Sequence, residues 1–195
     1  MNKNRLEAFS DGVLAIIITI MVLELKIPHG DDWHSLQNLL PKFISYVTSF
    51  IYVGIYWNNH HHLLHTVKHV NGTILWANMH LLFWLSLVPF VTAWAGENHF
   101  TELPVAAYSF ILLMAAIAYF ILSKMIVHVH GKDSFLSTVI GKDLKGIASF
   151  IAYALAVIFS FILKEISLCL IVGVALLWLI PDKRIEKNLK ENDNK

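Results

Sequence analysis

The 195-residue sequence contains a single cysteine, Cys169, and only 15% of its residues are charged. One cysteine cannot form an intrachain disulfide, so a fold stabilised by internal disulfides is excluded. The Gly-x-Ser-x-Gly and His-Glu-x-x-His motifs of serine hydrolases and zinc peptidases are also absent, and we do not expect an enzyme. The formal net charge is only +1, which provides no basic surface for nucleic acid.

Hydrophobic residues are abundant instead, at 56% of the chain, and the mean hydropathy is +0.59. Soluble domains rarely average so apolar, so we predict an all-α polytopic membrane protein. A membrane-spanning helix needs about 20 mostly apolar residues. Six stretches approach this description, at about residues 6–25, 43–64, 74–94, 105–122, 147–163 and 166–180. We therefore expect residues 1–195 to form one domain of six transmembrane helices.

The basic residues are distributed unevenly between the two sides of such a domain. If the N-terminus is cytoplasmic, only Lys26, Lys42 and Lys164 of the 15 lysines and arginines lie outside. Lysine and arginine are enriched in cytoplasmic loops of membrane proteins. We therefore expect both termini to be cytoplasmic.

The first predicted span begins with a polar segment. Arg5, Ser10 and Asp11 precede an uncharged run that continues from residue 12 to residue 23. A carboxylate at the start of a membrane helix is costly and needs partners. We therefore expect neighbouring helices to supply polar groups to this segment.

Large aliphatic residues occupy one face of the same span. At about 100° per residue, Ile16, Ile20 and Leu23 fall within roughly 60° of one another, and Thr19 borders them. If symmetry copies of this helix surround an axis, the side chains form successive constrictions that can close a pore by dewetting. Many membrane helices carry aliphatic residues at this spacing, so the pattern alone does not indicate a pore.

Three motifs resemble those of the transmembrane protein 175 family of potassium channels. The Arg-x-x-x-Phe-Ser-Asp segment at residues 5–11 resembles the signature of the family's first helix. Trp57 and His60 look like its Trp-x-x-His element, and Asn78 resembles the asparagine of its third helix. The resemblance implies a potassium-preferring channel, built as a homotetramer of six-helix chains in a prokaryotic plasma membrane.

The resemblance also implies roles for individual residues. Rings of aliphatic side chains form the family's gate and selectivity constriction, which implies Ile16, Ile20 and Leu23 here, with Thr19 as the nearby polar position. A polar network holding the first helix against the second and third is implied for Arg5, Ser10, Asp11, Trp57, His60 and Asn78. The Thr-Val-Gly-Tyr-Gly filter is absent, so a potassium preference must arise without a cage of carbonyl groups.

Eleven histidines leave an alternative function open, that of a histidine-dependent metal transporter or a haem-binding membrane protein. His61, His65 and His69 recur at every fourth residue, and such spacing on one helical face suits a metal or a proton relay. His60 and His80 could serve as axial haem ligands. The last three spans contain no acidic residue, however, which disfavours a metal exporter. We expect an interfacial histidine rim, with no bound metal and no cofactor.

Overall fold

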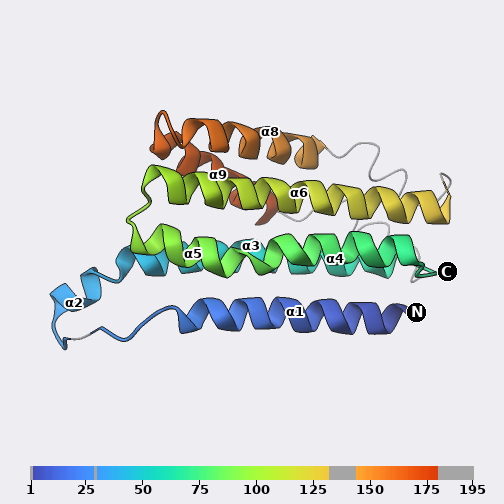
Figure 1. The fold of residues 1–195 in the computed structure, drawn as a ribbon, viewed down its shortest axis with the longest axis horizontal. Coiled ribbons are helices and arrows are strands. Elements are labelled where there is room, and N and C mark those ends of the chain that lie inside the picture. Colours follow the sequence, from blue (N-terminus) through green and yellow to red (C-terminus); the bar gives the residue numbers. More distant parts are fainter. Residues whose placement is uncertain (1, 29, 132–143, 180–195) are drawn as a thin grey trace.

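The computed structural model describes residues 2–28, 30–131 and 144–179, and these residues form helices and connections without a β-strand (Figure 1). The predicted all-α class is confirmed. The helices are α1 (Lys3–Leu23), α2 (Trp33–Gln37), α3 (Leu40–His65), α4 (Gly72–Ser86), α5 (Val88–Glu97), α6 (Glu102–His130), α8 (Leu144–Phe159) and α9 (Lys164–Leu179).

A helix or helix pair overlaps most of each of the six stretches predicted to cross the membrane. Three segments are long and apolar enough to do so by themselves, namely α1, the α4–α5 pair over Gly72–Glu97, and α6. Helix α3 has 26 residues but ends in a histidine-rich segment, and α8 and α9 have 16 residues each. The number of crossings and the location of the termini therefore stay predictions.

The long helices run roughly parallel to one another, with α1 at one side of the bundle and α8 at the other (Figure 1). Helix α6 packs against both α4 and α8, while α3 packs against α1 and α5. Ala115 and Ala118 of α6 are fully buried, and Ala156 of α8 is too. Small residues let membrane helices approach closely, which replaces the hydrophobic driving force that lipid does not provide.

The third predicted span, expected as one helix, is broken in the structure. Helix α4 ends at Ser86 and α5 begins at Val88, with Leu87 as the shared cap residue. Pro89 lies in the first turn of α5, where its missing N–H group is tolerated. The two helices still form one apolar segment over Gly72–Glu97 that is long enough to cross a membrane, so the break at Leu87 interrupts the helix and leaves the predicted span as a candidate.

The polar connection between the fourth and fifth predicted spans, over Lys124 to Lys145, begins later than the sequence predicts. Helix α6 continues to His130 and ends at Gly131, which has a φ of 90° and whose N–H donates to the Val127 carbonyl over 2.9 Å. Glycine tolerates this conformation because it has no Cβ atom. The rest of that connection, residues 132–143, lies outside the described residues.

The last two predicted spans, separated by only two residues, correspond to a tight pair of helices whose turn lies earlier than the predicted boundary at residues 164–165. Helix α8 ends at Phe159 and α9 begins at Lys164, so residues 160–163 make the turn. Near the other end of the pair, the indole N–H of Trp178 donates to Ser149 Oγ over 2.8 Å.

Gly96 permits the closest approach of α5 to α3. A Cβ atom at this position would lie 2.8 Å from the Cα atom of Lys42. We expect Gly96→Ala to lower stability by about 1–3 kcal/mol, as overpacking generally does. Thermal unfolding in detergent measures the effect. Gly54→Ala is the matched control, since its Cβ would meet nothing within 4 Å; an equal loss in both variants would contradict this explanation.

Candidate functional site

Helix α1 has two aliphatic faces, and only one of them is covered by the rest of the chain. Leu14, Ile17 and Met21 are each at most 3% exposed. On the other face, Ile16 is 58% exposed, Ile20 43% and Leu23 78%. The fold thus leaves the predicted constriction residues uncovered and buries the face beside them.

Thr19, the predicted polar neighbour of this uncovered face, is also exposed. Its hydroxyl group donates to the carbonyl oxygen of Ile16 over 2.9 Å. The hydroxyl proton is therefore bonded to the backbone of the same helix, and the hydroxyl oxygen can still accept a hydrogen bond. Together, Ile16, Thr19, Ile20 and Leu23 form what we call the α1 outer face.

A buried chain of hydrogen bonds joins the start of α1 to α4 and α3. Asn78 Nδ2 donates to Ser10 Oγ over 3.0 Å, and Ser10 in turn donates to the Leu6 carbonyl over 2.8 Å. His60 Nε2 lies 2.7 Å from Asn78 Oδ1. Because the amide nitrogen of Asn78 already donates, its oxygen accepts, and this arrangement assigns a proton to His60 Nε2.

All three of these side chains are shielded from solvent. Ser10 and Asn78 are 0% exposed and His60 is 2% exposed. A buried polar group without a hydrogen-bond partner costs about 1–3 kcal/mol of folding free energy. Removing any one of the three side chains would therefore leave a buried partner unsatisfied. The chain of bonds consequently favours one rotation of α1, the rotation that turns Ile16 and Ile20 outward.

Asp11, which follows Ser10 in the sequence, lies outside this buried chain of hydrogen bonds. Asp11 is exposed, and its Oδ1 accepts the indole N–H of Trp57 over 3.0 Å. Arg5 is exposed as well, and its guanidinium group makes no hydrogen bond or ion pair to the residues that the structure describes. The structure therefore brings together five of the six residues predicted for the network, in two separate groups. A place for Arg5 in it stays a prediction.

A second polar region, which the sequence analysis missed, lies behind the other half of α1. Ser49 contacts both Thr92 Oγ1 and the hydroxyl oxygen of Tyr108, at 2.6 and 2.7 Å. Ser45 donates to the Thr92 carbonyl over 2.7 Å. Two serines spaced four residues apart inside an apolar span were the available indication, because a buried hydroxyl group needs a partner.

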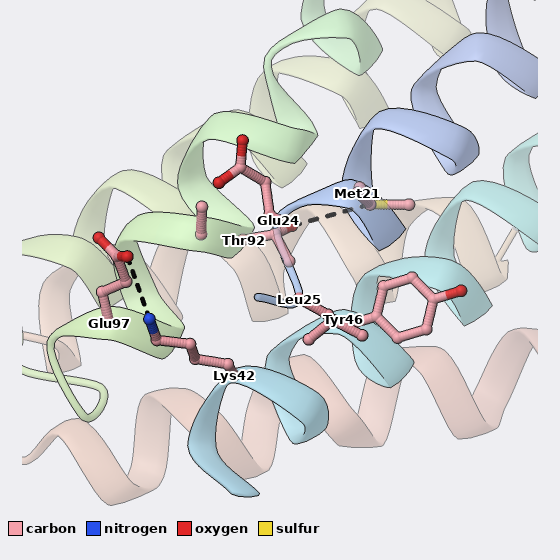
Figure 2. A pocket seen from close by; sticks show the side chains of 8 residues that line it. Met21, Glu24, Leu25, Lys42, Tyr46, Thr92 and Glu97 are labelled. Atoms are coloured by element: carbon pink, nitrogen blue, oxygen red, sulfur yellow. Dashed lines mark hydrogen bonds and ion pairs between the residues drawn. The ribbon is translucent and has the colours of Figure 1, made fainter. Parts of the chain in front are cut away.

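A shallow pocket opens beside this region, between α1, α3 and α5 (Figure 2). Met21 and Thr92 line its interior, and the Oγ1 atom of Thr92 is 3.9 Å from the Met21 sulfur. At the rim, Lys42 Nζ pairs with Glu97 Oε1 at 3.1 Å, and the carboxylate of Glu24 lies nearby (Figure 2). The exposed ion pair contributes little stability, but it marks where α3 and α5 meet.

The predicted histidine face is divided by the end of α3. His61 and His65 lie on the helix with ring centroids 6.4 Å apart, whereas His69 lies beyond it and stacks on His130. Within the described ranges, no group of three or more His, Cys, Asp or Glu side chains could hold a metal ion. The two histidines considered as haem ligands already have hydrogen-bond partners. His60 bonds to Asn78, and His80 accepts the indole N–H of Trp84 over 2.9 Å.

Comparison with known proteins identifies the family. The family described as endosomal/lysosomal potassium channel TMEM175 matches residues 5–89. A potassium channel from Chryseobacterium sp. (strain P1-3) is 60% identical over 192 residues, which cover 98% of this chain and 100% of the relative. The chain belongs to the TMEM175 family. The family predicted from the sequence is thereby confirmed.

Two further comparisons extend the relationship of this TMEM175 chain. A potassium channel from Streptomyces collinus is 36% identical over 128 residues, covering 61% of this chain and 62% of the relative. The crystal structure of a lysosomal potassium-selective channel TMEM175 homologue from Chamaesiphon minutus superposes with a TM-score of 0.79 at 28% identity, covering 91% of this chain and 96% of that one. These TMEM175 relatives are named as channels and not as enzymes, which supports the expectation of a non-enzymatic protein.

Proposed function

We propose that the protein is a potassium channel of the bacterial plasma membrane, in which four copies place their α1 helices around one pore. The observation that carries the proposal is the orientation of α1. The subunit buries Ile17 and Met21 but leaves Ile16 and Ile20 uncovered. Relatives of this TMEM175 chain that are named as potassium channels support the choice of ion.

A single α1 helix cannot enclose a pore, so the proposal requires several copies. Closed rotational symmetry is the usual arrangement of identical subunits, and it brings the same face of every copy to a common axis. With α1 on that axis, Leu23, Ile20 and Ile16 form three stacked rings of aliphatic side chains. The buried face of each α1 then continues to pack against α3, α4 and α5 of its own subunit.

Such rings offer a permeating ion no hydrogen bonds. An ion must shed or compress part of its water to pass, and a narrow apolar passage also tends to dry, which closes the pore. Potassium gives up water more readily than sodium, so the rings favour potassium without a carbonyl cage. Thr19 adds an oxygen close to the rings, where it assists rehydration between them.

The arrangement of charges supports a cytoplasmic N-terminus. Lys3 Nζ donates to the His65 carbonyl over 2.9 Å, so the start of α1 and the end of α3 lie together. The Lys68 amide in turn contacts His130 at the end of α6. Lys3, Arg5 and Lys68 thus occur at the same end of the bundle, as expected for the cytoplasmic side.

Ion flux from liposomes tests the proposed function. Purified protein in liposomes loaded with potassium should release it when a potassium gradient is imposed, and the release should be faster than with sodium at equal concentration. Liposomes without protein are the control. Equal rates for both ions would refute the potassium preference, and an absence of flux for either would refute the channel.

Cross-linking tests the placement of α1. Cysteine introduced as Ile20→Cys in a Cys169→Ser background should form symmetric cross-links between subunits in the membrane, because the axis brings four copies of that position together. The native Cys169 must be removed since it is exposed. Leu176→Cys, an exposed position on α9, is the matched control. Efficient linkage at Leu176 with none at Ile20 would show that α9, and not α1, is central.

A further inference from the structure

His130, the last residue of α6, is hydrogen-bonded in a way that requires an uncharged imidazole ring. Its Nδ1 atom lies 2.9 Å from the Ile126 carbonyl, one turn earlier in the helix. A carbonyl oxygen only accepts, so Nδ1 carries the proton. The Nε2 atom then accepts two backbone N–H groups, from Lys68 at 3.0 Å and from His69 at 3.2 Å.

These contacts fasten the connection between α3 and α4 to the end of α6. The connection, residues 66–71, contains no acidic residue, and the ring of His69 stacks on that of His130 at 6.4 Å with an angle of 6°. His130 therefore serves as an acceptor for backbone groups that lie beyond the last turn of α3. Gly131 ends α6 directly after His130.

We infer that His130 is a pH-sensitive latch, which releases the α3–α4 connection from α6 when the imidazole ring is protonated. A proton on Nε2 converts the acceptor into a donor that faces two N–H groups. Both hydrogen bonds are then lost, because neither side offers an acceptor. The bond from Nδ1 to Ile126 survives, so the ring stays on α6 while the connection moves away.

The basic groups around His130 disfavour a positive charge on its ring and so favour the latched state. The ring of His69 stacks on that of His130, the connection also contains Lys68, and His128 lies on α6 itself. Helix α4 carries no acid, and the first turn of α8 carries Lys145. Lys3 of α1 lies at the same end but is paired with Glu7 at 3.8 Å. The C-terminal end of α6 favours a cation and therefore acts against these basic groups.

Release of the connection affects the part of the protein that holds α1. Residues 66–71 join α3, which carries Trp57 and His60, to α4, which carries Asn78. Trp57 and Asn78 bond to Asp11 and Ser10 at the start of α1, and His60 bonds to Asn78. Assigning the latch to the cytoplasmic side rests on the orientation in the proposed function, whereas the latch itself does not depend on conduction.

Amide hydrogen exchange of the full-length protein in detergent, read by mass spectrometry, tests the latch. After correction for intrinsic exchange rates, protection of the Lys68 and His69 amides should fall roughly tenfold when the pH is lowered from about 7.5 to about 5.5. His130→Gln supplies an uncharged acceptor and should retain protection at both pH values. His130→Lys should lack protection at both.

Two matched variants assign the effect to one ring. His128→Gln changes an exposed histidine on the same helix and should behave as the wild type. His69→Gln should keep the pH dependence, because its backbone N–H remains. Nitrogen-15 shifts of the histidine rings should show His130 protonated at Nδ1 near pH 7.5. Protection that does not change with pH, or that falls equally in His130→Gln, would overturn the inference, as would loss of the pH effect in His69→Gln alone.

Discussion

Ile20→Ala and Ile16→Ala are expected to raise the potassium conductance of the channel and to weaken its preference over sodium. Both substitutions widen a ring that forces ions to lose water. We expect the potassium-to-sodium permeability ratio to fall by up to about tenfold, which corresponds to a barrier difference of about 1.4 kcal/mol. Leu23→Ala should have a weaker effect, because it lies at the end of the helix. Currents in planar bilayers with both ions measure the two quantities.

Substituting asparagine at one ring separates the effect of ring hydration from the effect of ring width. An amide group holds water at the constriction, so Ile20→Asn should weaken the closed state even though the side chain is not much smaller. Val22→Ala is the matched control, since Val22 is 44% exposed on another side of α1. Ile17→Val changes the buried face and should cost about 0.5–1.5 kcal/mol of stability without altering selectivity. Changed permeation in these two variants, with none at Ile16 and Ile20, would show that the pore face is misassigned.

Asn78→Leu is expected to destabilise the subunit more than any other single change in the polar network. It leaves the imidazole N–H of His60 without an acceptor and removes the donor to Ser10, and both groups are buried. Each unsatisfied group costs about 1–3 kcal/mol, so we expect a loss of at least about 2 kcal/mol. At roughly 2–4 °C per kcal/mol, the melting temperature should fall by about 4–8 °C.

Asn58, an asparagine on α3, provides the control for Asn78→Leu. Asn58 is exposed, and Asn58→Leu should shift stability by no more than about 0.5 kcal/mol. Because the network sets the rotation of α1, any Asn78→Leu protein that still assembles should also conduct with reduced selectivity. An unaltered melting temperature together with unaltered selectivity would mean that packing alone holds α1 in place.

Predicting the helical stretches from the sequence succeeded because hydrophobic length is a local property. Each predicted span has a counterpart among the helices. The predicted boundaries differ from the observed ones at several helix ends. The structure also interrupts the third predicted span next to Pro89, where α4 ends and α5 begins. Proline is tolerated in membrane helices when neighbouring groups satisfy the freed backbone, so its presence did not settle whether the helix would break.

The residues of the site were less predictable than the helices. Ser10 and Asp11 are adjacent in the sequence, yet Ser10 is buried against Asn78 while Asp11 is exposed and bonded to Trp57. Adjacent positions on a helix point about 100° apart, so they meet different neighbours. The contact of His130 with Lys68 and His69 spans more than sixty positions and had no counterpart in any motif.

By itself, the sequence determined the all-helical membrane class, the approximate extent of the helices and, through its motifs, the family. Those features depend on hydropathy and on short residue patterns, which can be read along the chain. Helical periodicity did not decide which face of α1 is turned outward; the family resemblance implied Ile16 and Ile20, and the tertiary structure leaves that face uncovered. Ile16 and Ile20 have the same chemistry and spacing as Ile17 and Met21, so periodicity cannot distinguish the two faces. Hydrogen bonds from Asn78 and Trp57, brought close by the fold, select between them.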